Sequence, residues 1–355
     1  MNIIKIKNFC LLLVASIALT FCMSCGSDEE EELIGNWTTL GSFDGSARGD
    51  ATGFVVGDTA YICLGYNSKA TALNDLWRYN QADRTWKRRA DFPAEARYAA
   101  VSFSVGGKAY VGLGYDGRTI YNDFWEYDPK TNVWTKVLAE FPGIERYYAV
   151  GAAVGGKGYV GTGYDGGSTL KDFYSFTPGV GPGEGTWAEV SSYEGSKREG
   201  ASVFVIGNSL YLLGGTTNNT NPVDMQKYDP ATDKWTKVMD MKNTDLTDID
   251  DKYDNIPRAY ASTFVINDKG YITLGQKTTS LYSTYEYDPS TNVWTERTLF
   301  SASHRSYAVS FSLTESGTNK NKRGFVMTGR SGSSTRFDDF FEFFPNDVNN
   351  TYDDY

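Results

Sequence analysis

Six arginines recur along the chain at nearly regular intervals, and this repetition limits the available folds more than any other feature. Successive arginines are 49, 49, 52, 60 and 47 residues apart, and an alanine follows each of them three positions later. Such periodicity predicts one supersecondary unit repeated six times rather than a single large core. The arginines are Arg48, Arg97, Arg146, Arg198, Arg258 and Arg305, and the alanines are Ala51, Ala100, Ala149, Ala201, Ala261 and Ala308.

The units also share a longer pattern of strand-like segments. RYAAVSFSVGGKAYVGLGYDG at 97–117 recurs as RYYAVGAAVGGKGYVGTGYDG at 146–166, and a Tyr-Asp-Pro turn and a late tryptophan recur further along. Aromatic residues make up 15% of the chain and there are 37 glycines, which favours short strands and tight turns. The pattern resembles the kelch repeat, and this resemblance implies one four-stranded blade per unit.

Kelch units carry a Gly-Gly pair after the second strand, and this chain departs from that pattern. We expect both glycines only at Gly214-Gly215. Elsewhere we assign the pair to Gly65-Tyr66, Gly114-Tyr115, Gly163-Tyr164, Gly275-Gln276 and Gly329-Arg330.

The sixth unit is incomplete at its C-terminal end. It stops after FDDFFEFFP at 337–345 without a tryptophan, whereas NWTTLGSFDGSAR at 36–48 aligns with VWTKVLAEFPGIER at 133–146. A strand around Trp37 therefore completes the sixth blade and leaves no free edge in the ring. We predict an all-β, six-bladed kelch-type β-propeller over residues 35–345, followed by a tail at 346–355.

Several repeated residues have an expected place in this fold. The alanine three positions after each arginine suits the crowded propeller axis, and the late tryptophan suits the wider gap between blades. We expect the aspartate of the N-D-x-W motif to cap a turn, with a serine replacing it in the fifth blade. These positions are Asp75, Asp123, Asp172, Asp224, Ser283 and Asp339.

Two segments, GLGYDG at 112–117 and GTGYDG at 161–166, match the G-x-G-x-x-G pattern of dinucleotide-binding loops. Such a loop must be followed by a helix whose N-terminus faces the pyrophosphate. The residues after GLGYDG, RTIYNDFWEYDP, have no helical periodicity. We therefore expect turn glycines at the ends of second strands rather than a nucleotide site.

The N-terminus is a separate segment. Lys5 and Lys7 precede the apolar stretch 11–21, which is too short to span a membrane and predicts a secretory signal over 1–25. The sequence CMSC resembles a lipobox, which implies lipidation at Cys25, with Cys22 or a plain cleaved signal as alternatives. The acidic linker 26–34 resembles a surface-export signal of Bacteroides-group lipoproteins. We expect an outer-membrane or cell-surface lipoprotein, with the periplasm as the alternative.

Charge and residue counts exclude several functions. Without residues 1–25 the chain has 32 Lys and Arg against 44 Asp and Glu, a net charge of −12 that disfavours nucleic acid. The same negative charge disfavours an anionic membrane surface, so we expect contact with a membrane only through the N-terminal lipid anchor. The copper site of galactose oxidase, a kelch-type enzyme, needs several histidines, whereas this chain has only His304. Zinc sites of the His/Cys type are excluded for the same reason, so we expect no cofactor. We also expect the propeller to be a monomer.

The arginines are the main candidates for a binding site. In a kelch propeller they emerge on the same face as the loops after the second strands, so we expect an Arg- and Tyr-rich channel mouth. Guanidinium and phenol groups suit a sugar acid, another glycan or an acidic protein partner. The alternative is structural, because a role in tying blades together predicts the same residue in every blade. The candidate ligand residues are the six arginines with Tyr115, Tyr148, Tyr164, Tyr260 and Tyr307.

Three functions remain open, and the third is a structural subunit of a larger outer-membrane assembly. The first is a non-enzymatic propeller that binds a glycan or a protein at this mouth. The second follows from a resemblance, in six kelch units behind a secretion signal, to bacterial N-acetylneuraminate mutarotases. That resemblance implies opening and closing of a sugar ring by an acid, a base and an anion-holding arginine, without a cofactor. Glu199 beside Arg198, or Glu145 beside Arg146, are the candidate catalytic groups.

Overall fold

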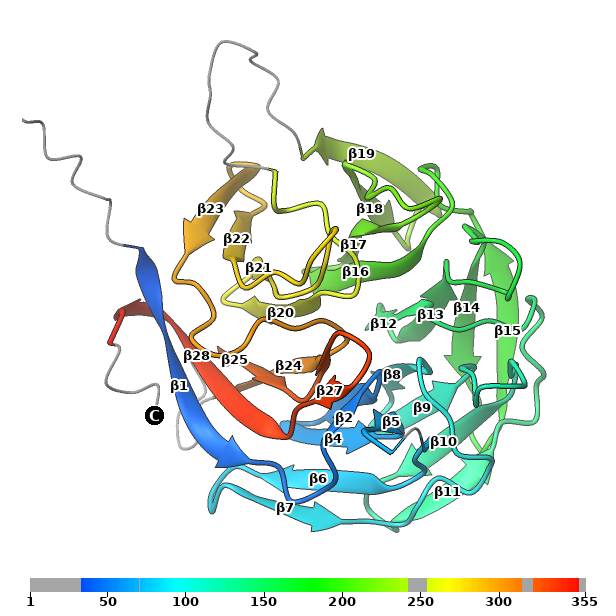
Figure 1. Ribbon diagram of the computed structural model, residues 1–355. Helices are drawn as coiled ribbons and strands as arrows, with labels where there is room; N and C mark the ends of the chain where they lie inside the picture. Colours follow the sequence, from blue (N-terminus) through cyan, green and yellow to red (C-terminus); the bar gives the residue numbers. More distant parts are fainter. Residues whose placement is uncertain (1–32, 70, 242–253, 315–321, 351–355) are drawn as a thin grey trace, which may run out of the picture. The chain divides into compact units, whose positions relative to one another are not determined.

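The computed structural model describes residues 33–69, 71–241, 254–314 and 322–350, and these residues form strands, turns and loops without a helix. In this part of the chain six four-stranded antiparallel sheets are arranged as the blades of a propeller (Figure 1). The predicted signal, the predicted lipidation site at Cys25 and most of the linker lie outside the described residues.

The first three blades follow the chain in order from inner to outer strand. Blade one consists of β3 (Thr52–Val56), β4 (Thr59–Cys63), β6 (Leu76–Asn80) and β7 (Thr85–Arg88). Blade two consists of β8 (Val101–Val105), β9 (Lys108–Gly112), β10 (Phe124–Asp128) and β11 (Val133–Lys136). Blade three consists of β12 (Val150–Val154), β13 (Lys157–Gly161), β14 (Phe173–Pro178) and β15 (Gly185–Val190).

Blades four and five repeat this order, and blade six combines both ends of the described chain. Blade four consists of β16 (Glu199–Ile206), β17 (Ser209–Thr216), β18 (Asp224–Asp229) and β19 (Lys234–Asp240). Blade five consists of β20 (Ser262–Ile266), β21 (Lys269–Thr273), β22 (Thr284–Asp288) and β23 (Val293–Arg297). Blade six consists of β24 (Val309–Thr314), β25 (Lys322–Met327), β28 (Asp339–Val348) and β1 (Ile34–Ser42). Two short ribbons pair β2 (Arg48–Gly49) with β5 (Tyr66–Asn67) and β26 (Arg330–Ser331) with β27 (Thr335–Arg336).

The Tyr-Asp-Pro segment forms the turn between the third and fourth strands of a blade. In blade two the Asp128 carboxylate accepts a hydrogen bond of 2.8 Å from the Lys130 N–H, an arrangement that favours a tight turn. Asn132 closes the turn at φ 58°, a conformation that asparagine tolerates, and its side chain accepts a hydrogen bond from the Tyr127 hydroxyl.

The tryptophans fill the spaces between neighbouring blades, as expected. Trp86 of blade one packs in a cluster with Phe311 and Phe340 of blade six. Trp294 of blade five is fully buried in a cluster with Phe204 of blade four. The two sheets that each such contact joins are separate and are not paired strand to strand. Burial of these rings therefore supplies much of the attraction between blades.

In five blades the glycine pair after the second strand lies one residue earlier than we assigned it, whereas the assignment of Gly214-Gly215 is correct. Gly214 and Gly215 both have positive φ, at 64° and 84°, and the equivalent pair in blade two is Leu113-Gly114, at 59° and 93°. The second glycine is kept because a Cβ on Gly114 would lie 2.8 Å from the Tyr98 carbonyl oxygen. At the first position Leu or Thr accepts the strained φ. The corrected pairs are Leu64-Gly65, Leu113-Gly114, Thr162-Gly163, Gly214-Gly215, Leu274-Gly275 and Thr328-Gly329.

The N-terminal strand closes the ring as predicted. β1 pairs antiparallel with β28, and Trp37 lies opposite Phe343. The Trp37 side chain is fully buried, with its ring 4.7 Å from that of Phe343. The ladder extends from Ile34 to Val348, so strand structure passes the boundaries that we expected at residues 35 and 345.

Candidate binding site at the channel mouth

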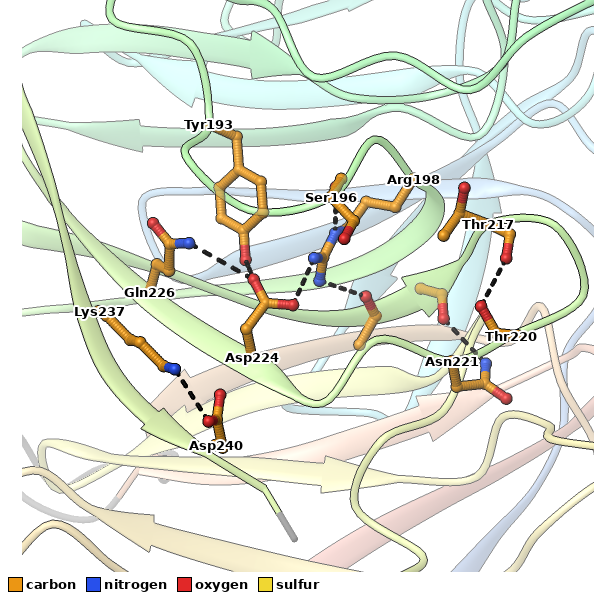
Figure 2. Close-up of polar contacts among 12 residues, drawn as sticks. Tyr193, Ser196, Arg198, Thr217, Thr220, Asn221, Asp224, Gln226, Lys237 and Asp240 are labelled. Carbon is orange, nitrogen blue, oxygen red and sulfur yellow. Dashed lines mark hydrogen bonds and ion pairs between the residues drawn. The ribbon is translucent and has the colours of Figure 1, made fainter.

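The repeated arginines lie inside the blades rather than on the mouth. Figure 2 shows the arrangement in blade four, where Arg198 donates to the carbonyl oxygens of Ser196 and Gly214, both at 2.9 Å. It also donates to the Asp224 carboxylate at 2.6 Å, and the Tyr193 hydroxyl donates to the same carboxylate. Each of the three guanidinium nitrogens therefore has a hydrogen-bond partner in the protein.

The same contacts recur in the other blades, which corrects two expectations. All six arginine side chains are at most 1% exposed, so these arginines do not present their guanidinium groups to a ligand and instead serve the structural alternative. The N-D-x-W aspartate does not cap a turn but pairs with the arginine of its own blade. The ion pairs are Arg48–Asp75, Arg97–Asp123, Arg146–Asp172, Arg198–Asp224 and Arg305–Asp339.

The electrostatics of these pairs follow from burial and charge. Burial alone would raise the pKa of Asp172, but the hydrogen bonds and charge of Arg146 hold it below its ordinary value. In blade five Ser283 replaces the aspartate, and Arg258 donates to the Ser283 hydroxyl and to carbonyl oxygens. Without a paired carboxylate, burial lowers the pKa of Arg258 to about 10.

The six positions that lie two residues after each arginine form a ring around the axis. Each member donates its backbone N–H to the carbonyl oxygen of its counterpart in the preceding blade, at 2.8 to 3.1 Å, and the six bonds close into a circle. This circle requires a left-handed backbone, and all six residues have φ between 53° and 58°. The members are Asp50, Ala99, Tyr148, Gly200, Tyr260 and Tyr307.

The repeated alanines lie beside this circle, as expected for residues nearest the axis. Together the circle and the alanines line a cavity of about 170 Å³. The lining residues are Asp50, Ala51, Ala99, Ala100, Tyr148, Ala149, Gly200, Ala201, Tyr260, Ala261, Tyr307 and Ala308.

Asp50 is the centre of a polar cluster at this cavity. Asp50 is 6% exposed, and its carboxylate accepts a hydrogen bond of 2.7 Å from the Tyr148 hydroxyl. It also pairs with Arg330 at 2.9 Å, and the Arg330 guanidinium lies 3.6 Å from the Tyr307 ring centroid. Burial raises the pKa of Asp50, although Arg330 and Tyr148 oppose the rise.

Glu199 is the second carboxyl group at the mouth. Burial raises its pKa, while a hydrogen bond from Tyr260 opposes the rise. The Tyr260 ring in turn stacks on the Tyr307 ring at 4.2 Å between centroids. Two carboxyl groups with raised pKa values are thus connected to one set of tyrosines, a combination found often at functional sites.

The outer rim of the mouth is built from residue pairs, one per blade. Each pair bridges the residue directly after the arginine with the residue directly after the repeated glycine. Every pair in the first three blades contains a tyrosine, and every pair in the last three contains at least one polar residue. The pairs are Gly49–Tyr66, Tyr98–Tyr115, Tyr147–Tyr164, Glu199–Thr216, Ala259–Gln276 and Ser306–Arg330.

A larger cavity of about 590 Å³ opens on this face between blades three and four. Hydroxyl and amide groups dominate its lining, together with the carboxyl group of Glu199 and the exposed ammonium group of Lys197. The lining residues are Tyr164, Gly167, Ser168, Thr169, Ser196, Lys197, Glu199, Thr216, Thr217, Asn218 and Asn219.

The structure thus separates the predicted site residues by location. Tyr148, Tyr260 and Tyr307 meet around the axial cavity, whereas Tyr164 and Glu199 line the larger cavity. Tyr115 lies on the rim. The six arginines are buried in the blades, and Glu145 is exposed and lines neither of the two cavities.

The sequence patterns did not identify Asp50 and Lys197 as candidate site residues. The signal for Asp50 was present, because an acid stands where the other units have Ala, Tyr or Gly. Among the described residues no group of three His, Cys, Asp or Glu side chains has the geometry to hold a metal ion. That part of the chain also has no helix long and apolar enough to cross a membrane.

Comparison with known proteins assigns the chain to a class. A ring of six four-stranded blades with these repeats defines a kelch propeller, and the family model for the KLHDC2/KLHL20/DRC7 Kelch-repeats domain matches residues 51–249. The chain belongs to the kelch-repeat family. The solved structure of YjhT shares this fold, with a TM-score of 0.66 and 18% sequence identity over 84% of this chain and 95% of YjhT.

Similarity to characterised relatives is local. N-acetylneuraminate epimerase of Shigella flexneri serotype 5b (strain 8401) is 36% identical over 96 residues, and that of Shigella sonnei (strain Ss046) is 36% identical over 94 residues. Each alignment covers 25% of this chain and 22% of the relative. The aligned part therefore spans about a fifth of these curated relatives.

Proposed function

We propose that the protein is a carbohydrate-binding kelch propeller whose ligand site is the cavity between blades three and four. The observation that supports it best is the chemistry of that cavity, about 590 Å³ lined mainly by hydroxyl and amide groups. Most small-molecule sites are largely apolar with a few polar groups. A lining that is mainly polar suits a ligand covered with hydroxyl groups.

Charge refines the class of sugar. Lys197 is an exposed cation at the cavity, and it suits a carboxylate on the ligand. Burial raises the pKa of the neighbouring Glu199, so its surroundings disfavour the charged carboxylate. A sugar acid is therefore the preferred ligand, in line with the local similarity to N-acetylneuraminate epimerases.

Calorimetric titration with N-acetylneuraminate and with neutral sugars tests this proposal. Lys197→Ala should weaken binding of the sugar acid about tenfold, because a hydrogen bond to a charged group contributes about 1.5–3 kcal/mol. The matched control is Lys157→Ala, since Lys157 is also exposed and lines a cavity of about 290 Å³ formed by turns on the opposite face. Equal effects of both substitutions, or no binding of any sugar, would contradict the proposal.

A second candidate function is mutarotation of the bound sugar acid, and the environment of Glu199 favours it. Ring opening needs a proton donor, and burial raises the pKa of Glu199, which favours its protonated form. Asp50 is the second carboxyl with a raised pKa at the mouth. These two residues replace Glu145 as the preferred candidates.

NMR saturation transfer between the anomers of N-acetylneuraminate measures this activity. Because a raised pKa keeps Glu199 protonated at low pH, the rate should be highest below that pKa and fall as pH rises through it. Glu199→Gln should abolish the pH-dependent acceleration, whereas Glu145→Gln should leave it unchanged. A rate equal to that in buffer would remove this function but not sugar binding.

The cellular location remains part of the proposal. Lipidation at Cys25 would hold the propeller at the outer membrane or cell surface. Mass spectrometry of the protein purified from its own cells, compared with Cys25→Ala, tests the anchor: a lipid mass on Cys25 is expected, and an unmodified, released variant should result from the substitution.

A further inference from the structure

Five tyrosines form a continuous arc of ring contacts across the rims of blades one to three. The successive contacts are Tyr66–Tyr98, Tyr98–Tyr115, Tyr115–Tyr147 and Tyr147–Tyr164, with ring centroids 5.0, 5.6, 5.0 and 5.5 Å apart. All five side chains are half-buried. We call this feature the tyrosine arc.

The propeller itself does not require the tyrosine arc. Rim pairs occur in every blade, but those of blades four to six contain no tyrosine, although the Glu199–Thr216 and Ser306–Arg330 pairs form the same bridges. The buried arginines, alanines and glycines recur in all six blades because the fold needs them there. Aromatic rings confined to three successive blades instead indicate a ligand that contacts one side of the mouth.

The two ends of the arc have different chemistry. Tyr164, at one end, lines the polar cavity between blades three and four. At the other end the Arg336 guanidinium lies over the Tyr66 ring, 5.5 Å from its centroid. Arg336 faces Arg330 across the β26–β27 ribbon, and because Arg330 is paired with Asp50, Arg336 supplies the cationic charge at this end. The arc thus joins a hydroxyl-rich cavity to a pair of guanidinium groups.

We propose that the tyrosine arc binds an extended acidic oligosaccharide whose terminal residue occupies the polar cavity. This inference rests on the proposed function and names its substrate class as a chain rather than a single sugar. The ring spacings are comparable to the length of one pyranose residue, so successive sugars can meet successive tyrosines. Burial raises the pKa of Tyr98 and Tyr147 to about 12, so their hydroxyl groups remain proton donors for sugar oxygens.

An oligosaccharide fits the arc better than an extended peptide does. Peptides that add to a sheet need unpaired backbone groups along a strand. In the arc the backbone is already paired, because Tyr98 and Tyr115 exchange hydrogen bonds of 2.9 and 3.0 Å, as Tyr147 and Tyr164 do at 3.0 and 2.9 Å. Side-chain rings and hydroxyl groups remain for contact, and these suit sugars.

A chain-length series tests the proposal on the full protein. An array of neutral and acidic oligosaccharides, each printed from monomer to hexamer beside a peptide library, identifies the series that binds, and calorimetry then gives each affinity. Affinity should rise at least tenfold from monomer to tetramer. Tyr115→Ala and Tyr66→Ala should remove that gain and leave monomer affinity unchanged. Tyr282→Ala, at an exposed tyrosine outside the arc, should change neither.

Each other outcome has a defined meaning. Monomer binding without a gain in affinity along the chain overturns the role of the arc but leaves the proposed function standing. Absence of any glycan binding overturns both, and tyrosine-dependent retention of peptides alone also overturns the proposal. Tyr66 belongs to a short ribbon at the rim, so Tyr66→Ala decides the question if Tyr115→Ala does not fold.

Discussion

At the scale of single residues, the six arginines illustrate how repetition separates structural from functional side chains. Arg146 donates to the carbonyl oxygens of Ile144 and Thr162 and pairs with Asp172, and its counterparts make equivalent contacts. A charge buried in this way is tolerated because each of its hydrogen-bonding groups has a partner. Residues that differ from blade to blade, such as Asp50 and Glu199, are instead the candidates for contact with a ligand.

Blades five and three together test this ion pair in both directions. Ser283→Asp should supply the carboxylate that Arg258 lacks and raise the free energy of unfolding by about 1–2 kcal/mol. Asp172→Asn should lower it by about 3 kcal/mol, because Arg146 would be left buried without a counter-charge. Urea unfolding measures both changes. A destabilised Ser283→Asp variant would show that the serine site is too small for a carboxylate.

At the scale of elements, glycines allow neighbouring blades to approach closely. Gly158 in β13 faces Phe103 of blade two, and a Cβ added there would lie 2.1 Å from the Phe103 ring. Gly270 and Gly324 face Phe204 and Phe264 in the same way. The phenylalanine of one inner strand thus occupies the space that a side chain on the next blade would fill.

Gly158→Ala should therefore destabilise the protein by about 1–3 kcal/mol, because overpacking forces the phenylalanine or the strand to move. Gly167→Ala is the matched control, since its nearest neighbour would be a carboxylate oxygen 3.6 Å away. Thermal unfolding followed by circular dichroism compares the two variants. Equal losses would mean that the contact with Phe103 does not limit packing.

At the scale of the whole propeller, stability depends on closing the ring between segments far apart in the sequence. β1 and β28 join the start and end of the described chain in one ladder (Figure 1). Trp37 lies between blades five and six with Phe264 and Phe343. The circle of six backbone hydrogen bonds at the axis closes only when all six blades are in place.

Trp37→Ala should cost about 3–5 kcal/mol and should weaken the closure before other parts of the ring. Hydrogen exchange should show protection lost first in β1 and β28. Trp187→Ala, which removes a half-buried tryptophan from blade three, should instead affect the contact between blades two and three. Identical exchange patterns in both variants would contradict a special role for closure.

The repeats predicted the number of blades, the alanines at the axis, the tryptophans between blades and the closing strand at Trp37. These features depend on local patterns and on an offset between repeats, both visible in one chain. The ligand role of the arginines was wrong because position on a face does not tell whether a side chain points outward or into its blade. Asp224, which pairs with Arg198 inside the blade, is 26 residues away in sequence.

Sequence alone therefore determined the architecture, because a repeated unit must bury the same face in each copy and a circle leaves no edge. Tertiary structure decided the site. It brought Asp50 and Arg330, 280 residues apart, into one ion pair and aligned five tyrosines from three blades. The physical reason is that side-chain partners at the mouth come from different repeats, and their distances follow from how the blades pack around the axis.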